Sequence, residues 1–251
     1  MHPGAAPPRP TVPDLERLTA RTWRGLEEEP FGDWALRAAG GFTGRANSVL
    51  VVGEPPLPLA GAVLAVAGWY ADRGLRPQAQ LPMPGAEAAD AAFGAAGWTR
   101  GEDVLVLTAG IGDWAGPAVR VQLDDAPDAG WLAGYRYRGT PLPAVAGDVL
   151  VHAEHPVFAS VRPDPYPAVP AAVARGVLVE DWLCVTAVTV DDGYRRRGLA
   201  TAVMAALGAW ARRGNATSCV LQVAASNGPA LALYDRLGFT EHHRYHYRVA
   251  P

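Results

Sequence analysis

Three consecutive arginines beside a glycine are the residues whose types and spacing most clearly indicate chemistry. Arg195, Arg196 and Arg197 precede Gly198 in the stretch VDDGYRRRGLATAVM. Guanidinium groups can donate two parallel hydrogen bonds to phosphate oxygens, and a glycine lets an anion approach the backbone closely. A bound anion would also offset the repulsion between the three like charges. The turn is therefore predicted to bind a pyrophosphate group, with a solvated arginine cluster as the alternative.

A helix must follow this turn if the site is to form. After the apolar run WLCVTAVTV and the turn, apolar residues recur at helical spacing at Leu199, Val203, Leu207 and Trp210. Arg212, Arg213 and Gly214 are typical of a helix C-terminus. The predicted helix therefore begins near Gly198, where its free N–H groups and the positive end of its dipole would face the anion.

A second, shorter helix is predicted to carry an amide and a phenol on one face. The stretch ASNGPALALYDRLGF starts with residues typical of a helix N-cap and first turn, and it stops at Gly238. Asn227, Ala230 and Tyr234 are spaced at i, i+3 and i+7, which places them on a common face. Such a face suits a cofactor groove, whereas Tyr234 alone would also fit a half-buried tyrosine whose hydroxyl reaches water.

The two stretches together resemble the GCN5-related N-acetyltransferase (GNAT) superfamily. Arg195-x-x-Gly198-x-Ala200 is similar to the family signature Arg/Gln-x-x-Gly-x-Gly/Ala, and the second stretch is similar to the family pattern Asn-x-x-Ala-x-x-Leu-Tyr-x-x-x-Gly-Phe. The first motif lacks the lysine of a Walker loop and the spacing of a GxGxxG fingerprint. The resemblance covers residues 118–251 well. It implies an α/β (α+β) fold with a mixed sheet, and acetyl-CoA as the acyl-donor substrate.

The resemblance also implies roles for individual residues. It assigns the pyrophosphate to the turn and the first helical residues: Arg195, Arg196, Arg197, Gly198, Leu199, Ala200 and Thr201. It assigns the pantetheine and the acetyl oxygen to a bulged strand, for which an ordinary core strand is the alternative: Ala187, Val188, Thr189 and Val190. Asn227 and Ala230 are expected to contact the cofactor, and Tyr234 is expected to protonate the leaving thiolate.

Acetyl transfer to an amine also needs a group that accepts a proton. Glu180 and Asp181, which precede WLCVTAV, are the first candidates for this base. His152 and His155 are the next candidates, and an ordinary surface turn residue is the alternative for each of the four.

The chain also contains a weak internal repeat. LAGAVLAVAGWYADRGLRPQAQLPM and DAAFGAAGWTRGEDVLVLT in the first half correspond to LATAVMAALGAWARRGNATSCVLQVA and LALYDRLGFTEHHRYHYRV in the second. We therefore expect a disordered N-terminus at 1–14, a degenerate GNAT-like domain at 15–112 and a catalytic GNAT domain at 118–251. Prolines and Phe93 stand in the first copy where the second has arginines and Tyr234, so only the second is expected to bind the coenzyme. Chance similarity of two alanine-rich helices is the alternative.

The overall composition excludes several classes of function. The 251 residues are 49% hydrophobic and 19% charged with a net charge of −3, which indicates a globular protein without general nucleic-acid binding. Cys184 and Cys219 are expected to be buried and reduced, and a cytoplasmic protein without a membrane partner is expected. The strand histidines would alternate between faces, so no metal site is expected at His242, His243 and His246.

The combined expectation is an acetyl-CoA-dependent N-acetyltransferase that acts on the amine of a small molecule. The tandem organisation resembles actinobacterial acetyltransferases similar to mycothiol synthase and to N-acetylglutamate synthases, and the latter favour an amino acid such as glutamate. A carboxylate on the acceptor would need an arginine, for which the unranked candidates are Arg37, Arg45, Arg136, Arg138 and Arg175. A non-catalytic acyl-CoA-binding regulatory module and a protein or peptide N-acetyltransferase are the alternatives, and the oligomeric state, including a homodimer, is left open.

Overall fold

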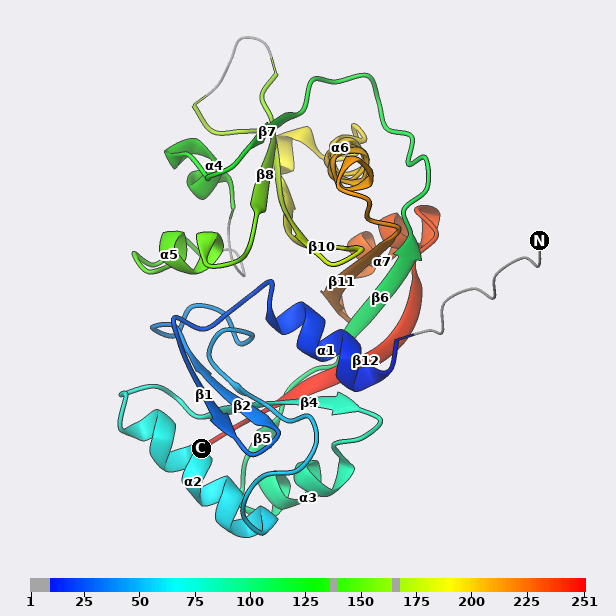
Figure 1. Ribbon diagram of the computed structural model, residues 1–251. Helices are drawn as coiled ribbons and strands as arrows, with labels where there is room; N and C mark the ends of the chain where they lie inside the picture. The colour runs from blue at the N-terminus through cyan, green and yellow to red at the C-terminus, as the bar shows by residue number, and fades with distance from the viewer. Residues whose placement is uncertain (1–9, 136–139, 164–167) are drawn as a thin grey trace, which may run out of the picture.

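The computed structural model describes residues 10–135, 140–163 and 168–251, which form one open mixed sheet with flanking helices (Figure 1). The first half contains α1 (Val12–Ala20), β1 (Glu27–Phe31), β2 (Trp34–Ala38), β3 (Val49–Leu50), α2 (Leu59–Ala71), β4 (Gln78–Met83), α3 (Glu87–Ala95), β5 (Thr99–Arg100) and β6 (Val104–Gly110). None of the helices in the described ranges is both long and apolar enough to cross a membrane.

The second half begins with a short strand and two short helices, and its later strands continue the same sheet. Its elements are β7 (Gln122–Asp124), α4 (Ala129–Gly134), α5 (Ala146–Val151), β8 (Pro156–Val161), β9 (Ala172–Val179), β10 (Trp182–Val190), the 3-10 turn η1 (Asp192–Tyr194), α6 (Leu199–Arg213), β11 (Ser218–Ala224), α7 (Gly228–Arg236) and β12 (Thr240–Val249). The predicted long helix after the arginines and the predicted short helix carrying Tyr234 are therefore confirmed as α6 and α7.

The first helix begins earlier than the sequence predicts. Residues 1–14 are expected to be disordered, but α1 starts at Val12. The Thr11 side chain accepts a hydrogen bond from the Asp14 N–H (3.3 Å), and the Asp14 carboxylate accepts one from the Thr11 N–H (3.2 Å). This reciprocal capping box stabilises the first turn, which also tolerates Pro13. The prediction is wrong for Val12 to Asp14, and residues 1–9 lie outside the described ranges.

Each half of the chain contributes one strand to the part of the sheet built by the other half. The strand order is β1-β2-β3-β4-β12-β6-β11-β10-β9-β8-β7, with β5 also paired to β12. β6, from the first half, lies between two second-half strands, so that Thr108 pairs with both Val220 and Thr240. β12 then continues onto β4, where Tyr247 pairs with Gln80 (Figure 1). Each half therefore depends on a strand that belongs to the other half.

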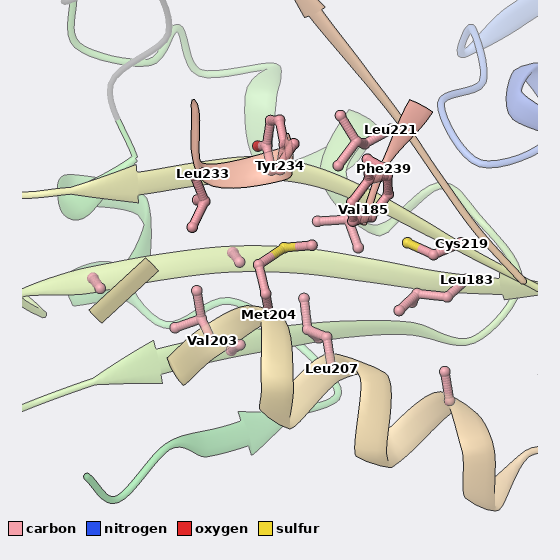
Figure 2. Packing of buried hydrophobic residues seen from close by; sticks show 14 of the residues in the cluster. Leu183, Val185, Val203, Met204, Leu207, Cys219, Leu221, Leu233, Tyr234 and Phe239 are labelled. Atoms are coloured by element: carbon pink, nitrogen blue, oxygen red, sulfur yellow. The ribbon is translucent and has the colours of Figure 1, made fainter. Parts of the chain in front are cut away.

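Several hydrophobic clusters pack against this sheet. The second-half cluster places α6 against the strands through residues such as Met204 and Leu207 (Figure 2). The first-half cluster surrounds the buried rings of Tyr70 and Phe93. On the sheet face opposite α6, α1 packs its Leu15 against β10 and β11. These clusters and the shared strands hold the face of β10 and β11 in a fixed position relative to the first half.

The two cysteines lie on neighbouring strands and face opposite sides of the sheet. Cys184 and Cys219 are both buried and free, as predicted. Cys184 belongs to the cluster under α1, whereas Cys219 belongs to the cluster under α6. Burial raises the pKa of both thiols, to about 12 for Cys184, so neither is a reactive thiolate at neutral pH.

The exchanged strands lead to a prediction about unfolding. Because each half needs a strand from the other half, the chain is expected to unfold in a single cooperative transition. The calorimetric enthalpy should equal the van't Hoff enthalpy, and far-UV circular dichroism and tryptophan fluorescence should change together. Two resolved transitions would contradict this expectation, since they would mean that one half stays folded without its donated strand.

Candidate active site

The arginine turn lies at the N-terminus of α6, and this terminus has no side-chain cap. Gly198 occupies the N-cap position with a φ of +75°. The first hydrogen bond of the helix runs from the Ala202 N–H to the Gly198 carbonyl (3.0 Å). The N–H groups of Leu199, Ala200 and Thr201 precede this bond and point out of the helix along its axis. Gly198 is exposed, so an anion can reach these donors.

The three arginines surround this helix terminus and are all exposed. Arg195 forms an ion pair with Asp192 (2.5 Å), and the Arg197 guanidinium lies 5.2 Å from the centroid of the Tyr194 ring. Arg196 has a φ of +60°, in the left-handed region that side chains rarely adopt. The local chain therefore turns sharply between β10 and α6, and it brings three cations to the end of the helix where an anion is favoured.

β10 and β11 separate just before this turn. The two strands pair in parallel only as far as Val185. On its other side, the register of β10 with β9 shifts between Thr186 and Thr189. Ala187 lies at this shift with a φ of +57°, a conformation that costs free energy for an L-residue. The bulge expected from the resemblance is therefore present, and it leaves an opening between two neighbouring parallel strands.

α7 places an amide and a phenol beside this opening. The Asn227 side chain accepts a hydrogen bond from the Ala230 N–H (3.2 Å) and so caps the helix. The Tyr234 side chain packs 5.6 Å from the Phe239 ring, centroid to centroid, and only 7% of the residue is exposed (Figure 2). Burial, and secondarily Cys219, raises the pKa of the Tyr234 phenol above its ordinary value. The phenol therefore keeps its proton at neutral pH.

A cavity of about 700 Å³ lies between the two halves. One wall consists of the separated strands and α7, including Val185, Thr186, Ala187, Val188, Thr189, Asn227, Ala230 and Tyr234. The rest of the lining comes mainly from the first half and from β12: Gly44, Arg45, Gln78, Gly101, Glu102, Tyr245, Tyr247 and Val249. The structure thus brings the predicted strand, the predicted amide and the predicted phenol to one space.

The two predicted base residues lie outside this cavity. Glu180 forms an ion pair with Arg21 (2.6 Å) in the turn between β9 and β10. Asp181 accepts a hydrogen bond from the Thr217 hydroxyl (3.0 Å). Both residues precede β10, whereas the bulge lies near the other end of that strand, and neither lines the cavity. The structure therefore does not bring Glu180 or Asp181 together with Tyr234.

The histidines singled out in the sequence are also absent from the cavity lining: His152, His155, His242, His243 and His246. His243 Nε2 lies 2.7 Å from Glu16 Oε1, and His246 Nε2 lies 2.7 Å from Asp90 Oδ1. These contacts tie β12 to α1 and to α3, which is a structural role.

The candidate arginines for an acidic acceptor fall into different environments. Arg45 lines the cavity. Arg37 is buried in the first half and donates to Gln80 (3.0 Å). Arg175 is fully buried on β9. Two candidates lie outside the described residues: Arg136 and Arg138.

Sequence reasoning missed the polar groups that the first half and the sheet supply to the cavity. Gln222 accepts hydrogen bonds from Arg45 Nη1 (3.0 Å) and from the Tyr245 hydroxyl (3.4 Å). Glu102 Oε2 accepts one from the Ser226 hydroxyl (2.7 Å). Only Gln222 carried a local signal, because it is the one polar side chain inside the apolar strand CVLQVA. Glu102 lies in the loop between β5 and β6, which carries no motif.

Comparisons with known proteins agree with this geometry. A family model described as "Probable histone acetyltransferase Rv0428c C-terminal" matches residues 11–248. The uncharacterized N-acetyltransferase YobR of Bacillus subtilis (strain 168) is 23% identical over 254 residues, which cover 94% of this chain and 97% of that protein.

Solved structures share the fold at low sequence identity. A GCN5-related N-acetyltransferase from Kribbella flavida is similar with a TM-score of 0.65 and 16% identity, covering 96% of this chain and 95% of that one. A tandem GNAT protein from the clavulanic acid biosynthesis pathway, solved without acetyl-CoA, is similar with a TM-score of 0.60 and 15% identity, covering 99% and 89% of the two chains.

Proposed function

The chain belongs to the GCN5-related N-acetyltransferase family, and on this premise we propose that it transfers the acetyl group of acetyl-CoA to the amine of a small molecule. An amino acid such as glutamate is the proposed type of acceptor. One observation carries the proposal: the separated strand β10 leads from the cavity directly to the exposed, uncapped start of α6. A long coenzyme could follow this path with its diphosphate at the helix and its thioester in the cavity.

The proposed coenzyme contacts follow from this path. The diphosphate accepts hydrogen bonds from the N–H groups at the start of α6 and from the arginines before it: Arg195, Arg196, Arg197, Gly198, Leu199, Ala200 and Thr201. The pantetheine runs along the bulged end of β10, against α7: Ala187, Val188, Thr189, Val190, Asn227 and Ala230. The exposure of the turn and the opening between β10 and β11 support this assignment.

The proposed reaction forms one C–N bond and breaks one C–S bond. The neutral amine attacks the thioester carbonyl, whose oxygen becomes negatively charged and is stabilised by the backbone at the bulge, at Ala187 and Val188. As the C–S bond breaks, the thiolate takes the phenolic proton of Tyr234. Water then reprotonates the Tyr234 phenolate. The proton lost by the nitrogen passes to Glu102, which is the one carboxylate among the described residues that line the cavity. Glu102 thus replaces Glu180 and Asp181 as the proposed base.

The first half is proposed to be a degenerate copy that closes the acceptor side of the site. The element order β3-α2-β4-α3-β5 parallels β10-α6-β11-α7-β12. Gly97 and Gly238 follow the corresponding short helices with φ values of +82° and +83°. Phe93 is buried on α3 as Tyr234 is on α7, but it has no hydroxyl. The first copy thus lacks the groups proposed to act in the second, and its loops contribute Arg45 and Glu102 to the cavity.

Thiol release from acetyl-CoA over a panel of amines tests the proposed function. The panel should include the amino acids, glutamate among them, and a lysine-containing peptide, because the matched family model is described as a probable histone acetyltransferase. Amine-dependent release with a free amino acid would support the proposal. Release with the peptide alone would favour a protein acceptor, and coenzyme binding without release for any amine would favour a regulatory module. The proposed location is the cytoplasm, in keeping with the two free cysteines.

A further inference from the structure

Two arginines from different halves of the chain lie against the same indole ring. The Arg45 guanidinium carbon lies 4.6 Å from the centroid of the Trp23 ring, and that of Arg175 lies 5.1 Å from it. Arg45 comes from the loop between β2 and β3, whereas Arg175 comes from β9. Trp23 is 1% exposed and donates its indole N–H to the Thr43 hydroxyl (2.6 Å). Stacking on an aromatic face stabilises each guanidinium, but it neutralises neither charge.

Arg175 is buried with part of its charge and one of its donors unmatched. Its Nε donates to the Leu150 carbonyl (2.7 Å) and its Nη1 to the Thr22 carbonyl (2.9 Å), while its Nη2 is buried and has no hydrogen-bond partner among the described residues. Within the described ranges, no carboxylate forms an ion pair with it. Burial, and then the nearby Arg45, lowers the pKa of Arg175 to about 9, so it is still a cation at neutral pH. A buried cation without an anion is costly, and a bound anion would lower that cost.

This pair of cations lies beside the proposed acetyl-transfer site. Thr186 on β10 pairs directly with Arg175, which puts both side chains on the sheet face that carries Trp23. The Thr186 hydroxyl is also buried, and no other residue in the described part of the chain forms a hydrogen bond with it. Thr186 and Arg45 line the large cavity, and both also line a small cavity of about 10 Å³ beside Trp23, which is large enough for one water. The unmatched donors are therefore next to the end of β10 at which the thioester is proposed to lie.

We infer that Arg45, with Arg175 behind it, forms an anion subsite in this cavity, and that the acceptor amine therefore carries a carboxylate. The inference rests on the proposed function. A planar carboxylate matches the two parallel donors of a guanidinium. Glu102, held by Ser226 at another part of the lining, faces the same cavity with a negative charge, which suits an amino group. Because Arg45 and Arg175 belong to different halves, the subsite exists only when both halves are assembled.

The charge balance disfavours a cationic peptide as the acceptor. Among the described residues, the cavity lining contains one arginine and one carboxylate, and Arg175 adds a second positive charge behind it. A lysine-rich segment would bring further positive charge to this region, where Glu102 is the one carboxylate among the described lining residues. An α-amino acid presents an amino group and an α-carboxylate, which match the two kinds of group that the cavity offers.

Pairs of acceptors that differ only in the carboxylate test this inference. Thiol release is measured for each α-amino acid and for its α-carboxamide, and the rates are compared at equal concentrations of unprotonated amine. The wild-type protein is expected to prefer the best carboxylate acceptor by roughly 10- to 100-fold in kcat/KM, the range expected for hydrogen bonds to a charged group. Arg45→Gln should remove most of this preference by raising KM, and it should leave the carboxamide within about twofold of wild type. Arg45→Lys keeps the charge but loses the two parallel donors of the guanidinium, so it should recover part of the preference for the carboxylate acceptor.

A control and a binding measurement make the outcome decisive. Arg24→Gln removes an exposed arginine that pairs with Glu28 outside the cavity, and it should leave both acceptors unchanged. N-acetyl amino acids have no reactive amine, so calorimetry with them measures binding at the subsite without turnover. Arg45→Gln should abolish the heat of binding seen with wild type. Equal kcat/KM for carboxylate and carboxamide in the wild type, or a preference that survives in Arg45→Gln, would overturn the inference. If no amine releases thiol, the proposed function fails, and the calorimetry alone decides the subsite.

Discussion

Replacing Tyr234 by phenylalanine is expected to lower the turnover number about 100-fold, within the range usual for loss of a general acid. The dissociation constant for acetyl-CoA should change by less than about threefold, because the ring and its packing against Phe239 are kept. The departing thiolate needs a proton at the cavity wall, and Tyr234 lines that wall with a phenol whose burial keeps it protonated. Steady-state thiol release and calorimetry with acetyl-CoA measure the two effects separately.

Tyr70→Phe provides the matched control. The Tyr70 hydroxyl is buried in the first half and donates to the Arg37 carbonyl (2.9 Å), away from the cavity. Losing this hydrogen bond should cost about 1 kcal/mol of stability and leave turnover unchanged. Tyr234→Phe removes no hydrogen bond to the described residues, so its stability should change little. Wild-type turnover in Tyr234→Phe would remove the proposed acid role.

The raised pKa of Tyr234 also has a consequence for the pH profile. Burial moves the pKa of this phenol above its ordinary value of 10.0, so the acid form persists throughout the pH range in which the rate is measured. Ionisation of Tyr234 is therefore expected to cause no loss of rate below pH 10. Any decline in rate below pH 10 should be the same in the wild type and in Tyr234→Phe. A decline at lower pH that disappears in this variant would mean that the phenol ionises more easily than its burial allows.

Gly198→Ala is expected to weaken acetyl-CoA binding by about tenfold or more. Gly198 has a φ of +75°, and a Cβ added there would lie 3.0 Å from Cδ and Cγ of Pro117. The variant must therefore either accept a left-handed alanine in close contact with a proline ring or move the first turn of α6. Movement would displace the N–H groups that are proposed to hold the diphosphate, and charge-assisted hydrogen bonds of this kind contribute about 1.5–3 kcal/mol each.

Gly74→Ala separates the backbone effect from the binding effect. Gly74 follows α2 with a φ of +62°, and a Cβ added there would meet open space. Both variants should lose about 1 kcal/mol or more of unfolding free energy because both put alanine in the left-handed region. Only Gly198→Ala should lose coenzyme affinity in calorimetry. If both bind acetyl-CoA as the wild type does, the start of α6 does not hold the diphosphate.

Local sequence was sufficient to predict the elements at one side of the site. The turn, α6 and α7 each lie within a short segment whose caps, glycines and apolar spacing specify their ends. The same kind of signal was present but overlooked at Thr11, where a capping box starts α1 inside a proline-rich stretch. These features depend on hydrogen bonds between residues a few positions apart, and such bonds can be inferred from spacing.

The structure places Glu180 and Asp181, the bases predicted from the sequence, away from the cavity because of the length of a strand. Both residues lie next to β10 in sequence, but an extended chain rises about 3.3 Å per residue, so the bulge at Ala187 is roughly 20 Å further along. Proximity in sequence to a strand therefore gave no proximity to the opening. Glu102, more than 120 residues before α7, reaches the cavity through its contact with Ser226.

By itself, the sequence determined the family, the turn that is proposed to bind the coenzyme and the position of Tyr234, because each is encoded within one strand, turn or helix. Tertiary structure alone decided that β6 and β12 exchange places between the halves, and that Arg45 and Arg175 meet on Trp23. The physical reason is that strand pairing and side-chain burial join residues more than 100 positions apart. Their alignment depends on how the whole sheet assembles and on no local repeat or motif.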